Sequence, residues 1–192
     1  VNGHGVGGDN ELGATVMQED TNEVVDAVSG RVGSDCEAII ITAGLGGGTG
    51  SGGAPVLAHE LKRIYDIPVY VLGVLPGRDE GALYQRNAGR SLKTLAREAD
   101  ATILVDNDAW RQAGESMDEG YAAVNEKIAQ RVGLLLAAGE FDPANVAAES
   151  VVDSSEVINT LREGSLAAIG YASAESSPDA DANLNTITSV AR

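Results

Sequence analysis

The chain alternates short apolar runs with longer segments that have one apolar face. Runs rich in β-branched residues occur at 38–43, 69–75 and 102–106, and segments with helical spacing of apolar residues lie between them at 54–65 and 81–99. Continuous apolar strands that alternate with amphipathic helices are typical of a parallel sheet covered on both faces. We therefore predict an α/β fold with three layers and a mostly parallel sheet.

The flanking segments extend this pattern. A helix is predicted over 9–28, after a glycine-rich loop, and another over 156–161, before a candidate strand at 166–172. A longer helix over 118–138 carries one apolar stripe at three- and four-residue spacing. The stripe consists of Tyr121, Val124, Ile128, Val132 and Leu135. The segment 173–183 is small, polar and acidic, as linkers are.

Composition narrows the class of protein. The 192 residues are 43% hydrophobic, which is enough for one substantial core. No apolar run approaches the roughly 20 residues of a membrane span, and no signal-peptide pattern opens the sequence. We therefore expect a cytoplasmic protein without a transmembrane segment. The single Cys36 excludes an internal disulfide, and with only His4 and His59 as histidines we expect no zinc site.

The strong negative charge limits the possible partners. A formal net charge of −16 argues against nucleic acid, because phosphate binding needs clustered lysine and arginine. The charge also opposes self-association in dilute salt, whereas the screening length falls to about 3 Å at 1 M salt. A protein from a very salty cytoplasm and an ordinary acidic protein both fit this composition.

Glycine occupies more than half of the stretch 44–55, GLGGGTGSGGAP. A glycine-rich turn between a buried strand and a helix gathers backbone N–H groups and the positive end of the helix dipole at one point, which suits a phosphate. A flexible linker is the alternative, but a linker is not expected between a buried strand and an amphipathic helix. The stretch therefore predicts a phosphate site whose donors are backbone amides.

Three common motifs fit this stretch poorly. The P-loop needs a lysine, and none lies between residues 1 and 61. The serine-hydrolase elbow fails because Thr49 stands in place of its first glycine. A dinucleotide fingerprint matches at Gly48, Gly50 and Gly53, but the acidic residue expected about 20 positions later would fall in an apolar strand.

The run GGGTGSG at 46–52 resembles the signature of the tubulin/FtsZ superfamily. Within it, the segments GHGVGGDNELG, GLGGGTGSGGAPVLA, PGRDEGALY, DNDAW and VVDSSEVINTL are most similar to the archaeal CetZ group. The resemblance implies a Rossmann-like GTPase domain over 1–139 that includes a central helix, a catalytic-loop segment and following strand over 140–172, and a linker with the start of a C-terminal domain over 173–192. It also implies that the N-terminal strand and most of the second domain are absent from this chain.

The resemblance assigns the phosphates of GTP or GDP to two loops that donate backbone amides. The first loop comprises Gly5, Gly7, Gly8, Asp9 and Asn10, and the second comprises Gly46, Gly47, Gly48, Thr49 and Gly50. Without the resemblance, the first loop is also an ordinary capping turn, with Asp9 as N-cap. The sequence predicts no metal-ligating residues, so Mg²⁺ would be held mainly by phosphates and water.

Five further residues are assigned to the nucleoside by the same resemblance. Glu80 would approach the ribose, and Asn87 matches a tubulin position seven residues farther on. Asn107 and Asn125 would bond the guanine edge, while Tyr121 would stack on the base. Tyr121 and Asn125 share a helix face, because they are four residues apart. The alternative for Tyr121 is a core aromatic residue on an amphipathic helix.

The segment VVDSSEV resembles the loop that a neighbouring subunit inserts against the γ-phosphate. Asp153 and Glu156 are three residues apart and could orient one water molecule together. The same spacing is also that of a helix capping box. Val151 departs from the asparagine of many relatives, which puts one polar contact of this loop in doubt.

Taken together, the resemblance implies a GTP-hydrolysing cytoskeletal protein with a role in cell shape. Copies would join head to tail into a longitudinal homopolymer, and hydrolysis would depend on this assembly. Two alternatives stay open: a nucleotide-binding scaffold that does not hydrolyse, and a Rossmann-type NAD-dependent enzyme.

Overall fold

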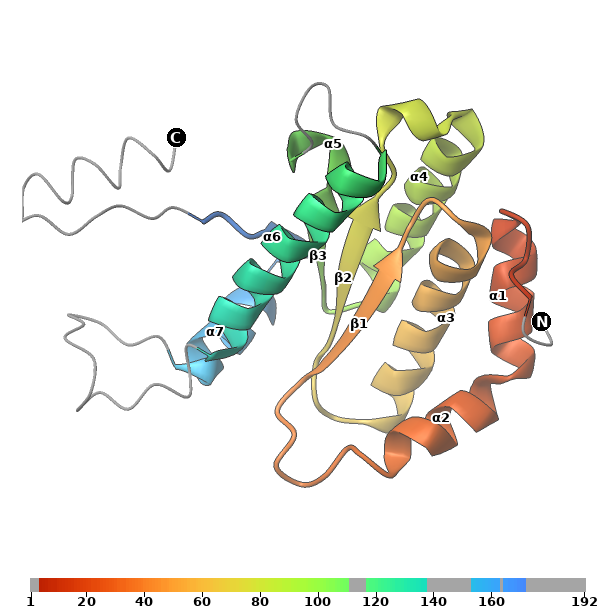
Figure 1. Cartoon of the computed structure of the whole chain (residues 1–192). Coiled ribbons are helices and arrows are strands. Elements are labelled where there is room, and N and C mark those ends of the chain that lie inside the picture. Colours follow the sequence, from red (N-terminus) through yellow and green to blue (C-terminus); the bar gives the residue numbers. More distant parts are fainter. Residues whose placement is uncertain (1–3, 111–116, 138–152, 163, 172–192) are drawn as a thin grey trace, which may run out of the picture.

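The computed structural model describes residues 4–110, 117–137, 153–162 and 164–171. Its centre is a parallel sheet of four strands in the order β1-β2-β3-β4 (Figure 1). The strands are β1 (Ile39–Gly44), β2 (Val69–Leu75), β3 (Ala101–Asp106) and β4 (Leu166–Ala168). The register pairs Gly44 with Val74 and Val74 with Val105, so the carboxyl ends of the first three strands are nearly level.

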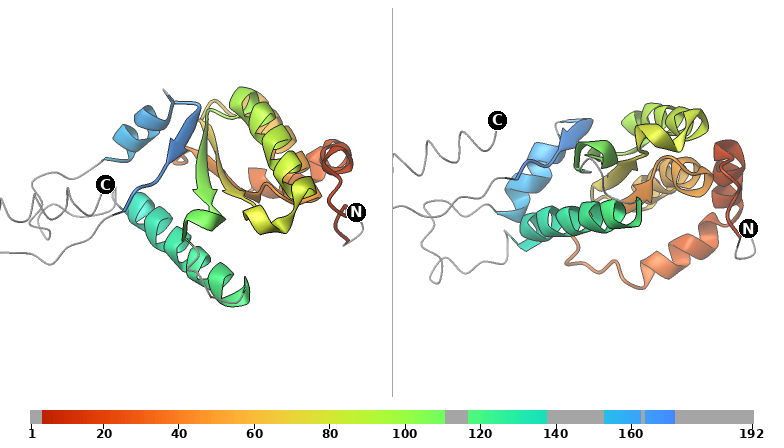
Figure 2. Two further views of the ribbon diagram at one scale, coloured as in Figure 1. Left: turned by 90° about the horizontal axis from the view of Figure 1, so that it is seen from above. Right: turned by 45° about the horizontal axis from the view of Figure 1, so that its top comes forward.

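Helices connect and flank these strands. They are α1 (Asn10–Glu19), α2 (Thr21–Ser29), α3 (Gly48–Ile64), the short 3₁₀ helix η1 (Arg78–Glu80), α4 (Ala82–Glu98), α5 (Asn107–Trp110), α6 (Met117–Ala137) and α7 (Ser154–Arg162). Seen from above, α3 and α4 lie on one side of the sheet and α6 on the other, with α1 outside α3 (Figure 2). The predicted three-layer α/β fold is confirmed.

The core consists of two apolar clusters, one on each face of the sheet. Strand β2 contributes to both, because neighbouring side chains of a strand point to opposite faces. Val69 and Val71 pack with residues of α3 and α4, such as Leu61 and Leu95. Leu72 packs with β3 and with Val124 of α6. Strand β2 is buried on both faces, which explains why it is apolar throughout rather than alternating.

Two helix boundaries differ from the sequence-based prediction. Helix α3 begins at Gly48, not Ala54, so the glycine stretch forms its first turns. The single helix predicted over 9–28 is two helices that meet at Asp20. The Asp20 N–H bonds to the Val16 carbonyl and Val24 bonds back to Asp20, but a backbone ψ of 6° at Asp20 interrupts the regular helix.

Some predicted features fall outside the described residues. The segment 140–152 and the linker region 173–192 are among them. Strand β4 is described but is shorter than predicted, because it ends at Ala168 whereas the sequence predicted a strand over 166–172. Across the parts of the chain that the structure describes, no helix combines the length and apolar character needed to cross a membrane.

Candidate functional site

The carboxyl ends of β1, β2 and β3 open into a cavity of about 210 Å³. This is the edge where α/β sheets bind ligands, because the loops that follow the strands meet there. The residues that line it are Gly44, Gly46, Gly47, Val74, Leu75, Pro76, Glu80, Tyr84, Asn107 and Tyr121. Five of them belong to the nucleotide set predicted from the sequence: Gly46, Gly47, Glu80, Asn107 and Tyr121.

The glycines of this region differ in what surrounds them. A Cβ atom added to Gly44 or Gly47 would meet nothing within 4 Å, so the backbone there is open to a ligand. Gly47 also caps α3 without any side-chain hydrogen bond to the first turn. The first N–H groups of that helix therefore remain available, together with the positive end of its dipole, for an anion.

Other glycines are needed for packing. A Cβ on Gly50 would lie 2.3 Å from the Gly44 carbonyl oxygen, and one on Gly52 would lie 2.2 Å from the Asn10 carbonyl oxygen. A Cβ on Gly48 would lie 2.6 Å from the backbone nitrogen of Asp9. Gly48, Thr49 and Gly50, which the sequence assigns to the same phosphate loop, are not among the residues that line the cavity. The bare backbone at Gly48, Gly50 and Gly52 lets α3 approach β1 and α1 closely.

The first predicted phosphate loop lies beside the second. Gly7 and Gly8 have φ values of 62° and 79°, which glycine adopts without strain. The Asp9 carboxylate caps α1 by accepting from the N–H groups of Glu11 and Leu12, as the alternative interpretation predicted. Gly5, Gly7, Gly8, Asp9 and Asn10 are not among the residues that line the cavity.

Two predicted polar residues connect the loops. The Asn10 amide donates to Ser51 Oγ at 3.0 Å, and Ser51 Oγ donates to the Gly47 carbonyl. Asn87 is 2% exposed, and its Nδ2 donates to the carbonyls of Gly8 at 2.9 Å and Gly46 at 3.0 Å. Asn87 therefore lies behind the loops and does not line the cavity.

The opposite wall of the cavity carries the residues predicted to hold the nucleoside. The Tyr121 hydroxyl donates to Glu80 Oε1 at 3.2 Å, and the same carboxylate oxygen accepts from the Gly77 N–H at 2.7 Å. Asn107 is 8% exposed at the start of α5. Asn125 is exposed on α6 one turn after Tyr121 and does not line the cavity. Glu80 and Tyr121 are thus fixed against each other by a hydrogen bond.

The predicted acids lie at the other end of the sheet. In Figure 1 the strands run upward to their carboxyl ends, and α7 lies at the lower left, near the level at which the strands begin. The Tyr70 hydroxyl, near the start of β2, donates to the Ile158 carbonyl of α7 at 2.8 Å. Ser154 donates to Glu37, just before β1. Since a strand of six residues spans about 20 Å at about 3.3 Å per residue, Asp153 and Glu156 do not reach the cavity of their own chain.

Asp153 and Glu156 are both exposed at the start of α7. The Asp153 carboxylate accepts from the Ser155 N–H at 3.2 Å, and the Asp153 carbonyl accepts from the Glu156 N–H at 3.0 Å. Asp153 therefore has the capping role that the spacing allowed. Its partners leave room at the carboxylate for a further ligand, because a carboxylate has about four acceptor positions.

Among the side chains that the structure describes, one has a clearly shifted pKa. Burial raises the pKa of Tyr70 above its usual value of 10.0, Asp100 raises it further, and Arg162 opposes this shift. The neutral phenol is therefore the stable form, and it ties β2 to α7 through its bond to Ile158. Among the described residues, no group of three or more histidine, cysteine, aspartate or glutamate side chains could hold a metal ion.

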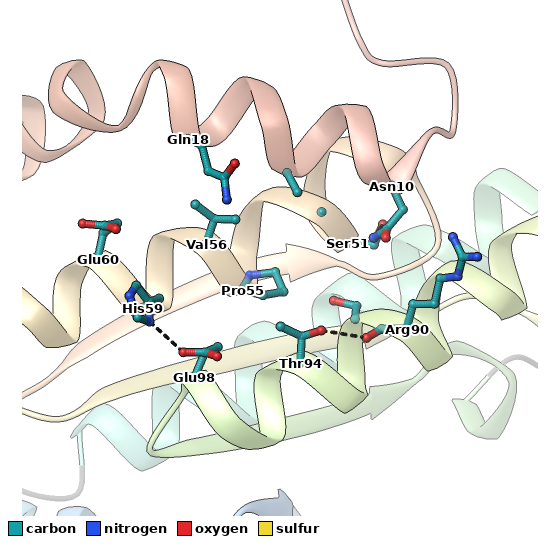
Figure 3. Close-up of a pocket in the computed structure, with 13 residues that line it drawn as sticks. Asn10, Gln18, Ser51, Pro55, Val56, His59, Glu60, Arg90, Thr94 and Glu98 are labelled. Atoms are coloured by element: carbon teal, nitrogen blue, oxygen red, sulfur yellow. Dashed lines mark hydrogen bonds and ion pairs between the residues drawn. The ribbon is translucent and has the colours of Figure 1, made fainter.

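A larger groove, of about 450 Å³, runs between α1, α3 and α4 (Figure 3). Its charged side chains are paired: His59 Nδ1 lies 2.8 Å from Glu98 Oε2, and Arg90 lies 3.2 Å from Glu11. The Asn10–Ser51 contact lies in its lining. The groove shares no lining residue with the cavity at the strand ends, so the two are separate.

Gly44, Pro76 and Tyr84 line the cavity but were not singled out from the sequence as site residues. Gly44 ends the first apolar strand and Pro76 follows the second, so their position after a strand was a usable signal. Tyr84 lies on the first turn of α4, and nothing in its local pattern indicates a site.

Comparison with known proteins gives consistent matches. Residues 1–115 match the family model described as "Tubulin/FtsZ family, GTPase domain", and residues 114–192 match "Tubulin-like CetZ, C-terminal domain". The chain is 69% identical over 192 residues to the tubulin-like protein CetZ2 of Haloferax volcanii, an alignment that covers 100% of this chain and 53% of that protein. The chain thus spans about half the length of the curated relatives it matches.

Solved structures agree with these matches. The GTPγS-bound protofilament of CetZ2 from Haloferax volcanii superposes with a TM-score of 0.88 at 68% identity, covering 98% of this chain and 54% of that one. The GDP-bound monomer of CetZ1 from the same organism gives a TM-score of 0.76 at 52% identity, covering 86% of this chain and 47% of that one.

Proposed function

Because the chain belongs to the tubulin/FtsZ family, we propose that it binds GTP and GDP at the carboxyl ends of its strands and hydrolyses GTP between copies assembled head to tail. Proteins of this family are GTPases in general. The relatives bound to GTPγS and GDP support guanine nucleotides as the ligands, and the protofilament of CetZ2 supports self-assembly.

One observation carries the proposal: the cavity and the exposed acids lie at opposite ends of the sheet. When copies stack end to end, the start of α7 of one copy faces the cavity of the next. Asp153 and Glu156 then supply acceptors for a water molecule beside the terminal phosphate. Phosphoryl transfer to water needs mainly such positioning and charge stabilisation. Neither the cavity nor the acids are sufficient alone.

The cavity itself fits a nucleotide in its parts. The open backbone at Gly47 and the uncapped start of α3 suit phosphates, because they offer N–H donors without a competing side chain. Tyr121 offers a ring for stacking, and Asn107 offers an amide that can both donate and accept. Mg²⁺ would neutralise phosphate charge from positions held by phosphate oxygens and water.

The proposal extends to the setting of the protein. A net charge of −16 supports function in a salty cytoplasm, where charge repulsion between copies is screened. Control of cell shape is the proposed role. A Rossmann-type NAD enzyme is disfavoured, because the acidic residue that its fingerprint needs about 20 positions after the glycines would fall in the apolar strand β2.

A substitution at the acidic end tests the proposal. In the full-length protein, Glu156→Gln should leave the dissociation constant for GTP within about twofold and lower the GTP turnover rate at least 100-fold, in the range seen when catalytic positioning groups are removed. The measurements are nucleotide titration and phosphate release at high potassium chloride.

Glu37→Gln is the matched control. Glu37 is an exposed acid at the same end that bonds Ser154, and its loss of charge should leave turnover unchanged. Normal turnover in Glu156→Gln would contradict the assignment of the acid. Binding of GTP without turnover in the wild-type protein would instead support the non-hydrolysing scaffold.

A further inference from the structure

Asn87 makes an unusual pair of contacts for a buried side chain. Its two amide hydrogens go to carbonyls of separate loops, Gly8 in the first and Gly46 in the second. The side chain is 2% exposed and comes from α4, which is not part of either loop. A buried amide that satisfies two backbone carbonyls fixes both in place, because breaking either bond would leave a buried group unpaired.

The bond to Gly46 determines the direction of the next N–H group. The Gly46 carbonyl and the Gly47 N–H belong to one planar trans peptide, so they point in opposite directions. Asn87 holds the carbonyl on the side away from the cavity. The Gly47 N–H therefore points toward the cavity, and within the described residues it has no protein acceptor.

A second contact acts on the following peptide. Ser51 is fully buried and donates to the Gly47 carbonyl, while it accepts from the Asn10 amide. Figure 3 shows Asn10 and Ser51 facing each other where α1 and α3 begin. The same planarity directs the Gly48 N–H away from Ser51. Neighbouring peptides of the second loop are thus each oriented by a buried polar side chain.

We propose that Asn87 is a positioning residue that aims the Gly47 N–H at the phosphates of a bound nucleotide by holding the Gly46 carbonyl and tying it to the Gly8 carbonyl of the other loop. This inference rests on the proposed nucleotide site and adds to it. Asn87 itself does not touch the ligand, although the sequence pattern placed it among the residues that would. Its substitution therefore weakens recognition of phosphates and leaves recognition of the base intact.

The test compares ligands with and without phosphates. In the full-length protein at high potassium chloride, calorimetric titration gives dissociation constants for GDP and guanosine in the wild type, Asn87→Asp and Asn87→Leu. The aspartate replaces the donor by an oxygen that repels both carbonyls, and the leucine removes the bonds at similar volume. We expect GDP binding to weaken about 10- to 100-fold, as for a lost hydrogen bond to a charged group, and guanosine binding to change less than twofold.

Ser91→Ala is the matched control. Ser91 lies one turn farther along α4 and is 1% exposed, and its Oγ has no hydrogen-bond partner among the residues that the structure describes. Substitution of Ser91 perturbs the same buried face of α4. Unlike Asn87, however, Ser91 does not orient a peptide of either loop. GDP and guanosine binding should both match the wild type in this variant.

The remaining outcomes separate the two proposals. If the wild type binds neither GDP nor guanosine, the nucleotide site itself is wrong. If the wild type binds GDP and the Asn87 variants bind GDP equally well, the positioning role is wrong. It is also wrong if the affinities of these variants for GDP and for guanosine fall to the same degree. Circular dichroism shows whether the variants are folded. If both Asn87 variants are unfolded, the positioning role is also wrong, because Asn87 would then be needed for the stability of the fold.

Discussion

At the scale of single residues, glycine has two separate uses within one junction. Gly47 has free space around it and faces the cavity, whereas Gly52 is pressed against the backbone of α1. The first use keeps amides accessible to a ligand. The second use brings two helices together so that the loops before them lie side by side. Both uses produce the same letter in the sequence.

Alanine substitutions distinguish these uses. Gly52→Ala should lower the free energy of unfolding by about 1–3 kcal/mol, because its Cβ would lie 2.2 Å from the Asn10 carbonyl oxygen and 2.6 Å from the Ala14 nitrogen. Gly47→Ala should change it by no more than about 0.5 kcal/mol, since φ −72° and ψ 173° suit alanine and the space is open. Urea denaturation measures both, and equal stability of the two variants would contradict this division.

Residue patterns predicted this site only in part. Gly46 and Gly47 were found because their motif is local and lies between a strand and a helix. The role of Asn87 could not be read from the sequence, because its partners lie 79 and 41 positions away. Asp9 and Asp153 matched both a functional motif and a helix cap, and only the folded structure shows that each caps a helix.

At the scale of secondary-structure elements, the strands and most helices followed from local burial patterns. The start of α3 did not, because glycine costs about 1 kcal/mol in a helix interior and predicts a loop. Close packing of α3 on α1 offsets that cost, and such packing is a tertiary effect that periodicity does not contain. The element that bears the acids, α7, is held in turn by Tyr70 at the start of β2.

The tie between β2 and α7 should depend on pH. Burial raises the pKa of Tyr70 in the folded state, so its contribution to stability is complete below the unfolded pKa of 10.0 and is lost as the pH rises through the folded pKa. At pH 8, Tyr70→Phe should lower the free energy of unfolding by about 1 kcal/mol, through loss of the hydrogen bond to Ile158. Above pH 10, the free energy of unfolding should fall less in this variant than in the wild type, because phenylalanine does not ionise. Urea denaturation at several pH values tests this, and parallel profiles of the two proteins would contradict it.

At the scale of the whole molecule, the residues proposed to bind the nucleotide and the acids proposed to orient water lie far apart. The sheet fixes the cavity at its carboxyl edge and α7 at its amino edge, and the strands between them keep these ends separate. In the proposed mechanism, a single copy would hold a nucleotide without the acids, and a row of copies would repeat one complete site at every junction. A heterologous contact of this kind continues into a filament if it does not close.

The dependence of GTP turnover on protein concentration tests this central claim most directly. Phosphate release is measured for the full-length protein at high potassium chloride, over a range of concentrations that spans the onset of assembly seen by sedimentation. Turnover per molecule should be near zero below that onset and should rise steeply above it. A turnover per molecule that stays constant across the whole range would contradict a site shared between copies.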